Sequence, residues 1–317
     1  MARAFYETRT SEPMPEFDAV TGVSTGGLIA PYAFVGTAKA LDDISRLYTQ
    51  SVNELKPRLD LLFLLKRTGG LLDRGKLEQT VTKVINSDLS AELREGFAKD
   101  RLLLTETTNL NSGLGHIWNI QQELTPGEAG LARYRSILIA STAIPGAFAP
   151  VMIDGDPHVD GGVASNTLLG ADLADFQRLA AALRKSGVRR DVRIRLWVLV
   201  NKPVYPAVQK INHRSVEAVY NRGTRLLFSL KELMTLTRYW ELSQAVTTGV
   251  PGLTMEMRFI GVPQELTGEV SLSRMVDPAL MRRLDQCGFE RARGNSRWDT
   301  LPVSAYARPA AETARSR

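Results

Sequence analysis

The sequence has little that would allow covalent or repetitive structure. It contains one cysteine, Cys287, in 317 residues, so no intramolecular disulfide can form and a small disulfide-stapled secreted fold is excluded. Internal repeats, low-complexity segments and linkers rich in glycine, proline or serine are also absent. Hydrophobic residues make up 44% and charged residues 23%, which excludes disordered, collagen-like and coiled-coil classes. We therefore expect a globular protein, organised as one domain.

The sequence also lacks a long hydrophobic run of the kind that crosses a membrane. The longest uncharged stretch, Ala19 to Ala38, contains four glycines, a proline and four Ser or Thr residues, which is not the composition of a membrane helix. Charged side chains interrupt the first twenty residues, so no secretory signal is present there. For the chain as written we expect a cytoplasmic or peripheral membrane protein, and an exported one if a longer N-terminus carries a signal.

Acidic residues are scarce in one segment. The chain has 40 Lys plus Arg against 34 Asp plus Glu, a net charge of +6. Arg178 to Arg225 holds twelve of the basic and two of the acidic residues, so this segment carries +10 and the rest −4. An anionic membrane surface is one partner for it, although a solvated helix face with a loop is the simpler interpretation. Without a helix-turn-helix cue, metal-ligand spacing or base-stacking aromatic residues, we expect no nucleic acid partner.

Strand-like and helix-like stretches alternate along the chain, which predicts an α/β fold with a mostly parallel sheet and helices on both faces. The expected strands are 17–21, 101–105, 117–120, 193–200 and 254–260, with a hairpin-like piece at 151–160. The expected helices are 26–51, 134–141, 213–244 and 278–293. We expect one domain at 17–294, a remnant helix or disordered segment at 1–16, and a flexible basic tail at 295–317.

The sharpest local motif is Gly22-Val23-Ser24-Thr25-Gly26, a G-x-S-x-G pentad between an apolar strand and a helical stretch. A nucleophile elbow requires this context, because a serine on a sharp strand-to-helix turn exposes its Oγ and crowds its neighbours, which favours glycine at both ends of the pentad. The turn also places Ser24 at a helix N-terminus, where free N–H groups favour a developing negative charge. Ser24 is therefore the candidate nucleophile, and the backbone N–H of Thr25 is the candidate oxyanion donor. An ordinary glycine-rich turn is the alternative.

A second motif, Val159-Asp160-Gly161-Gly162, follows a strand-like stretch. Its two glycines allow another backbone to approach closely, and a carboxylate held there can orient or deprotonate a serine hydroxyl. Asp-Gly is also a common turn dipeptide, so this motif alone decides nothing.

Together the motifs resemble the patatin-like phospholipase family, and in particular its bacterial members. The stretches that carry the resemblance are FDAVTGVSTGGLIAPYAFVG, LLLTETTNLNSGLGHIWNI and ILIASTAIPGAFAPVMIDGDPHVDGG. It covers residues 17–201 well and the remainder loosely. The resemblance implies a patatin-like domain and a lipid acyl hydrolase of lipid catabolism, which cleaves carboxylic esters through a catalytic dyad and an acyl-enzyme. Ser24 would be the nucleophile and Asp160 the base, without histidine, metal or organic cofactor.

We expect one feature of that family to be absent from the chain as written. Its members open with a strand, a glycine-rich loop that supplies oxyanion donors, and a helix. Sixteen residues precede Phe17 and none is glycine, whereas a strand-helix-strand unit needs roughly 30 residues. We therefore expect the N-terminal strand and the oxyanion loop to be absent, and the chain as written to be a poor catalyst.

Two other interpretations stay open. Ser24, Asp160 and His213 occur in the chain order of an α/β-hydrolase triad, although residue 24 leaves no room for the strands that precede the elbow in that fold. Alternatively, the protein is a non-catalytic lipid-surface binding module that uses the segment from Arg178 to Arg225 as its headgroup contact. His116 and His158 are expected to be structural.

Overall fold

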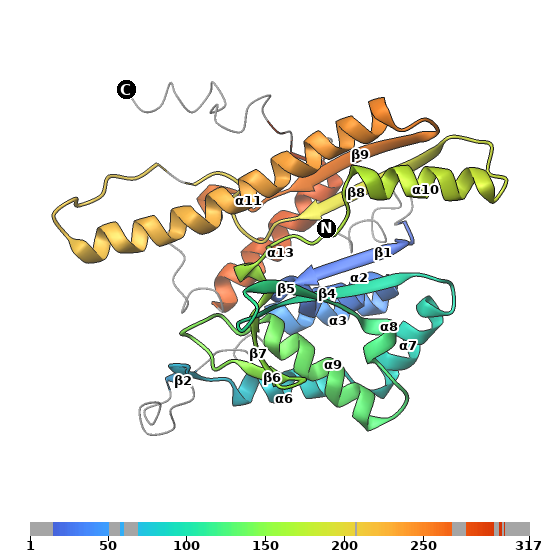
Figure 1. The fold of residues 1–317 in the computed structure, drawn as a ribbon. Coiled ribbons are helices and arrows are strands. Elements are labelled where there is room, and N and C mark those ends of the chain that lie inside the picture. The colour runs from blue at the N-terminus through green and yellow to red at the C-terminus, as the bar shows by residue number, and fades with distance from the viewer. Residues whose placement is uncertain are drawn as a thin grey trace. The chain divides into compact units, whose positions relative to one another are not determined.

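A computed structural model describes residues 15–50, 58–59, 69–206, 208–267, 277–294, 298–299 and 301. The chain divides into two compact units (Figure 1): the first is Met1–Leu168 with Glu269–Asn295, and the second is Leu169–Gly268 with Ser296–Arg317. The expected boundaries at 17–294 stay a prediction. The N-terminal segment 1–14, where a remnant helix and the loss of a strand and loop were expected, lies outside the described residues, as does most of the tail.

The first unit combines a mixed sheet with helices, which confirms the predicted α/β class. Its strands are β1 (Ala19–Val23), β2 (Arg58–Leu59), β3 (Leu72–Asp73), β4 (Leu102–Asn109), β5 (Leu114–Asn119), β6 (Val151–Ile153) and β7 (Asp156–Asp160). Its helices are α2 (Thr25–Val35), α3 (Ala38–Thr49), α6 (Gly75–Val84), α7 (Ser87–Phe97), α8 (Ile120–Glu123), α9 (Glu128–Ser141), the 3₁₀ helix η1 (Gly161–Val163) and α13 (Pro278–Arg293).

Strand β4 is the centre of this sheet. One of its edges pairs with a single strand and the other edge pairs with two strands in succession. Strand β5 pairs with one edge, where His116 lies opposite Thr107. On the other edge β1 runs parallel to β4 and ends with Val23 opposite Glu106, and β7 runs antiparallel and ends with Asp160 opposite Thr107. Strands β1 and β7 therefore end at adjacent positions of one edge. The residues that follow β1 and those that end β7 are brought together by this register.

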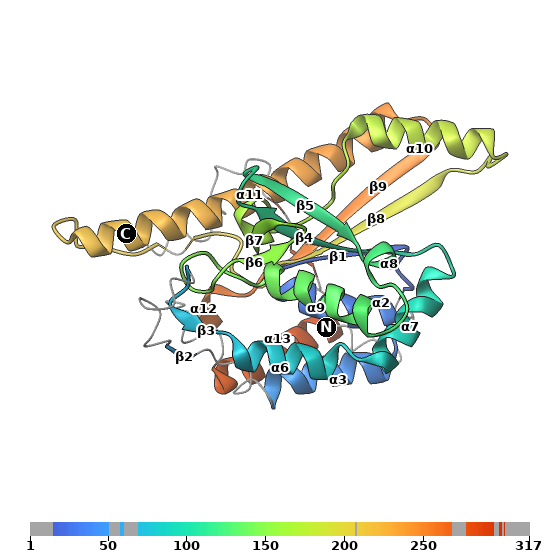
Figure 2. The ribbon, with the colours of Figure 1, turned by 60° about the horizontal axis from the view of Figure 1, so that its bottom comes forward.

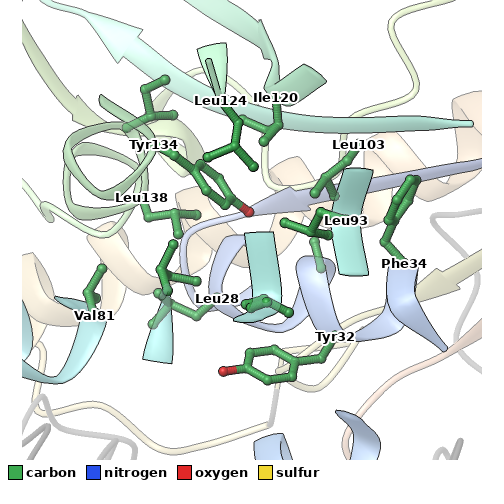
Figure 3. Close-up of a cluster of buried hydrophobic side chains, with 14 of the residues drawn as sticks. Leu28, Tyr32, Phe34, Val81, Leu93, Leu103, Ile120, Leu124, Tyr134 and Leu138 are labelled. Carbon is green, nitrogen blue, oxygen red and sulfur yellow. The ribbon is translucent and has the colours of Figure 1, made fainter. Parts of the chain in front are cut away.

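Helices α2 and α9 lie along the same side of the sheet (Figure 2). Their apolar side chains form the main core with β4, α7 and α8 (Figure 3); its members include Leu28, Tyr32, Phe34, Leu93, Leu103, Ile120, Tyr134 and Leu138. Full burial of one such side chain stabilises the fold by about 1.5–3 kcal/mol. This core fixes the N-terminus of α2 below the end of β1.

The helix expected at 26–51 is two helices. Gly36 ends α2 with φ 70°, a left-handed conformation that glycine adopts freely, and its N–H donates to the Tyr32 carbonyl. Thr37 then begins α3, because its side chain accepts a hydrogen bond from the Ala40 N–H. Because α2 ends at Gly36 and α3 begins directly after it, the single helix expected at 26–51 is divided in two.

The second unit is built on two parallel strands, β8 (Val192–Leu199) and β9 (Leu253–Ile260), which confirms both predicted strands within two residues. Its helices are α10 (Leu173–Lys185), α11 (Val216–Gly249) and α12 (Gln264–Thr267). The C-terminal half of α11 packs on the strands through Leu233, Leu236 and Tyr239 in one cluster and through Val246, with the C-cap residue Val250, in another. Within the described part of the chain, no helix is both long and apolar enough to cross a bilayer.

Candidate active site

Ser24 occupies the turn between β1 and α2 in a strained conformation. Its φ is 55° and its ψ −126°, a region that residues with a Cβ adopt at a cost on the order of 1–3 kcal/mol and that is common at functional sites. It is the N-cap residue of α2, and its carbonyl accepts the Gly27 N–H at 2.9 Å. The half-buried side chain is presented at the positive end of this helix. Ser24 therefore occupies a strained strand-to-helix turn at the position where the sequence places one.

The two glycines of the pentad differ in what they do. A Cβ on Gly22 would lie 2.4 Å from the Gly26 carbonyl oxygen and 2.8 Å from the Ala30 Cβ, so only glycine fits there. A Cβ on Gly26 would meet no atom within 4 Å. The expectation that crowding requires glycine at both positions is right for Gly22 and wrong for Gly26, whose missing side chain would project into open space from the first turn of α2.

Asp160 lies beside Ser24 and is 5% exposed. Its Oδ2 accepts a 2.7 Å hydrogen bond from Ser24 Oγ, and its Oδ1 accepts one of 2.7 Å from the Gly162 N–H. The Asp160 backbone is tied down as well, since its N–H donates to the Ala143 carbonyl and its carbonyl accepts from Thr108 Oγ1. The carboxylate is thus fixed through one oxygen and offers the other to the serine hydroxyl.

A close backbone contact requires glycine at the first position of the second motif, and a side-chain contact crowds the second position. A Cβ on Gly161 would lie 2.4 Å from the Glu106 carbonyl oxygen and 2.9 Å from Val23 Cγ1. A Cβ on Gly162 would lie 2.4 Å from Asn166 Oδ1. Gly161 therefore permits β7 to end against β4 and next to β1, and its role explains why the two motifs meet.

Ser141, which the sequence did not single out, supports the elbow from the C-terminal residue of α9. Its buried Oγ accepts the Ser24 N–H at 3.0 Å and donates to the Glu106 carbonyl at 2.8 Å. One hydroxyl thus connects the elbow to the β4 residue whose carbonyl also lies against Gly161. Ser141 follows a run of apolar helix residues without a glycine or another local signal, so only the tertiary structure reveals this contact.

His158 is held in a structural network on the same strand as Asp160. The Trp118 indole N–H donates to Thr107 Oγ1 at 2.8 Å, and this hydroxyl is 2.8 Å from His158 Nδ1. The indole N–H can only donate, so Thr107 Oγ1 accepts there, and the tautomer of His158 sets whether the same hydroxyl donates to Nδ1 or accepts from it. Burial lowers the pKa of His158, and the nearby His116 adds to this effect. The expected structural role of His158 agrees with these contacts.

His213, the histidine of the alternative triad, is an exposed residue of the second unit, whereas Ser24 and Asp160 both belong to the first. Within the described residues, no group of three or more His, Cys, Asp or Glu side chains is placed to hold a metal ion.

The arrangement provides three elements that acyl transfer needs. Ser24 supplies a hydroxyl, and Asp160 supplies a carboxylate in direct hydrogen-bond contact with it. Thr25 is the first residue of α2, and the N–H groups in the first turn of a helix have no acceptor within the helix. The site can therefore activate a serine and stabilise negative charge next to it.

Comparison with known proteins agrees with this geometry. A sequence model described as patatin-like phospholipase matches residues 2–173, which is more than half of the chain and includes both motifs. No significant match was found among curated proteins.

Proposed function

Because the chain belongs to the patatin-like phospholipase family, whose activity is lipid acyl hydrolysis, we propose that it cleaves carboxylic esters of lipids through a dyad of Ser24 and Asp160. The observation that carries the proposal is the 2.7 Å hydrogen bond between Ser24 Oγ and Asp160 Oδ2. A serine hydroxyl is a weak nucleophile at neutral pH and needs an adjacent base, which this contact supplies.

The proposed reaction has two steps. As Ser24 Oγ attacks the ester carbonyl, its proton moves to Asp160, and the tetrahedral oxyanion lies at the N-terminus of α2 near the Thr25 N–H. The carbon–oxygen bond of the leaving alcohol then breaks, and the alcohol takes the proton from Asp160. In the second step Asp160 accepts a proton from water, the hydroxide oxygen attacks the acyl-enzyme, and the fatty acid leaves while Ser24 regains its proton.

The surroundings of Asp160 favour its role as base. Its second oxygen is held by the Gly162 N–H, so the carboxylate does not need to reorient before it accepts a proton. We further propose that the protein meets its substrate in transient contact with an anionic membrane surface.

The test is turnover of a short soluble ester such as p-nitrophenyl butyrate by single variants of the full chain. Ser24→Ala and Asp160→Asn are each expected to lower kcat by about 1000-fold or more, because nucleophile and base act as one unit and their losses do not add. His213→Ala serves as the control and should leave kcat/KM within about twofold of the parent enzyme.

Any other outcome would indicate a different function. Full activity of the Ser24→Ala variant would refute the dyad, and collapse of the His213→Ala variant would establish a Ser-Asp-His triad in its place. A parent chain that binds lipid but hydrolyses no ester would be a non-catalytic lipid-surface module.

A further inference from the structure

The N-terminal half of helix α11 stands apart from the core of its unit. The helix is continuous from Val216 to Gly249, and its C-terminal half runs beside β9 (Figure 1). The residues that join the core clusters begin at Leu233, and none of the described side chains from 216 to 231 belongs to them. The described side chains of this half of the helix therefore lie outside the hydrophobic core of the second unit.

The same half of α11 nevertheless carries large apolar side chains that face solvent. The exposed apolar residues, called the α11 stripe below, are Val216, Val219, Tyr220, Leu227, Leu230 and Met234. Val216 is 86% and Leu227 73% exposed. At 3.6 residues per turn the six residues fall within about 100° of the helix circumference. An exposed apolar stripe of this kind marks an interaction surface.

Basic residues accompany the stripe. Residues 208–231 contain five Lys or Arg and one acidic residue, Glu217, a net charge of +4. The helical spacing places Arg222 on one side of the stripe and Lys231 on the other. Arg225 lies on the opposite face of the helix. An apolar stripe flanked by basic residues is the pattern of a helix that lies in the interface of a membrane, with its apolar face among the acyl chains and its basic residues at the headgroups.

We propose that the α11 stripe, with its flanking basic residues, is the surface through which this protein binds an anionic lipid bilayer. The inference rests on the proposed function only in that a lipid ester hydrolase must reach its substrate in a bilayer. The charge decides between occupants: two copies of the stripe packed together would bring two segments of charge +4 into contact, whereas acidic headgroups neutralise them.

The test is co-sedimentation of the full chain with vesicles of dialkyl ether phosphatidylglycerol or dialkyl ether phosphatidylcholine. Ether lipids have no ester to cleave, so binding is measured whether or not the chain is a hydrolase. Binding to the anionic vesicles should be at least about tenfold tighter and should weaken as salt rises, because each basic residue near an anionic surface contributes to attraction that salt screens.

Two pairs of matched variants locate the surface. Val216→Ser with Leu227→Ser is expected to weaken binding about tenfold or more, whereas Met152→Ser on β6, an apolar residue 63% exposed, should not. Arg222→Glu with Lys231→Glu is expected to weaken binding to phosphatidylglycerol, whereas Arg282→Glu with Arg283→Glu on α13, which changes the net charge equally, should not.

Hydrolysis of a soluble short ester and the thermal midpoint serve as folding controls, and both should be unchanged in the stripe variants because the stripe lies outside the core clusters. Equal binding to the two vesicle types, or equal losses in stripe and control variants, would overturn the proposal. So would stripe variants that bind vesicles normally but change the oligomeric state in solution, since the stripe would then contact a second copy. None of these results depends on Ser24, so the dyad and the lipid surface fail separately.

Discussion

Ser24 and Asp160 lie 136 positions apart in the sequence and are joined by a 2.7 Å hydrogen bond from Oγ to Oδ2. The register of β4 produces this contact, because β1 ends opposite Glu106 and β7 ends opposite Thr107 on one strand edge. The contact between Ser24 and Asp160 is therefore a consequence of where two strands stop, and changes at the strand ends should affect it more than changes in the helices around it.

The pentad glycines provide the first prediction. Gly22→Ala should lower the free energy of unfolding by about 1–3 kcal/mol and disturb the elbow, because the new Cβ lies 2.4 Å from a backbone oxygen. Gly26→Ala should leave stability unchanged or raise it by up to about 1 kcal/mol, since alanine is the better helix former and its Cβ meets no atom. Urea denaturation of both variants measures this difference. Equal losses would contradict the assigned packing.

Ser141 is predicted to act as a positioning residue. Ser141→Ala removes the acceptor of the Ser24 N–H and the donor to the Glu106 carbonyl, so the elbow loses its anchor to β4. Loss of these bonds is expected to cost about 1–3 kcal/mol, and kcat for a soluble ester should fall about tenfold or more with KM unchanged.

Ser136→Ala is the matched control for this prediction. Ser136 is on the same helix, and its Oγ donates to the Ala132 carbonyl within that helix. Its loss should leave kcat within about twofold of the parent. A Ser141→Ala variant that matches this control in kcat, or that changes only KM, would remove Ser141 from the site.

The lowered pKa of His158 should make the stability of the protein depend on pH. Burial and His116 hold its pKa below the usual value of 6.5, against the opposing effect of Asp156 and Asp154, and the residue is 2% exposed. The unfolded chain therefore binds the proton more readily than the folded chain, so protonation favours unfolding. The free energy of unfolding has its full value above about pH 6.5 and decreases as the pH falls below that value. Each unit by which the pKa is lowered corresponds to about 1.4 kcal/mol.

His158→Asn isolates this effect. The Asn side-chain amide has both an acceptor oxygen and a donor N–H for the Thr107 hydroxyl but does not titrate. Between pH 7.5 and pH 5, the free energy of unfolding should decrease less in the variant than in the parent. The difference between the two decreases is the contribution of His158. Parallel pH profiles would show that His158 is not responsible.

The substitution Tyr134→Phe is expected to be neutral or stabilising. Its ring is fully buried in the main core, and its hydroxyl has no hydrogen-bond partner among the described residues. Burial of that hydroxyl also raises its pKa. Tyr134→Phe keeps the ring and removes an unpaired polar atom, so the free energy of unfolding should stay the same or rise by about 1 kcal/mol. A loss of more than about 1 kcal/mol in a denaturant titration would mean that the hydroxyl is paired.

The sequence predicts the parts of this fold that depend on local pattern. Apolar alternation locates β8 and β9, and the glycines around Ser24 and Asp160 indicate both site residues before any contact is known. The break between α2 and α3 is also written locally, in Gly36 and Thr37, although the helical pattern on both sides obscures it.

Long-range pairing is what the sequence does not predict. The antiparallel addition of β5 and β7 to β4 depends on contacts between distant segments, and it departs from the parallel arrangement that alternating strands and helices predict. Ser141 is missed for the same reason, since an isolated serine at a helix end acquires its role only when α9 packs beneath the elbow. The surface role of α11 likewise requires knowledge of which half of the helix the core leaves exposed.

If Ser24 attacks the ester and carries the acyl group, mass spectrometry should detect the acyl-enzyme itself. The full chain is mixed with p-nitrophenyl butyrate, quenched in acid within the first turnovers and digested. The account predicts a butyryl adduct on the peptide that contains Ser24, absent from the Ser24→Ala variant and formed much more slowly in Asp160→Asn. An adduct on another residue, or hydrolysis without any adduct on Ser24 under conditions that trap acyl-enzymes, would contradict it.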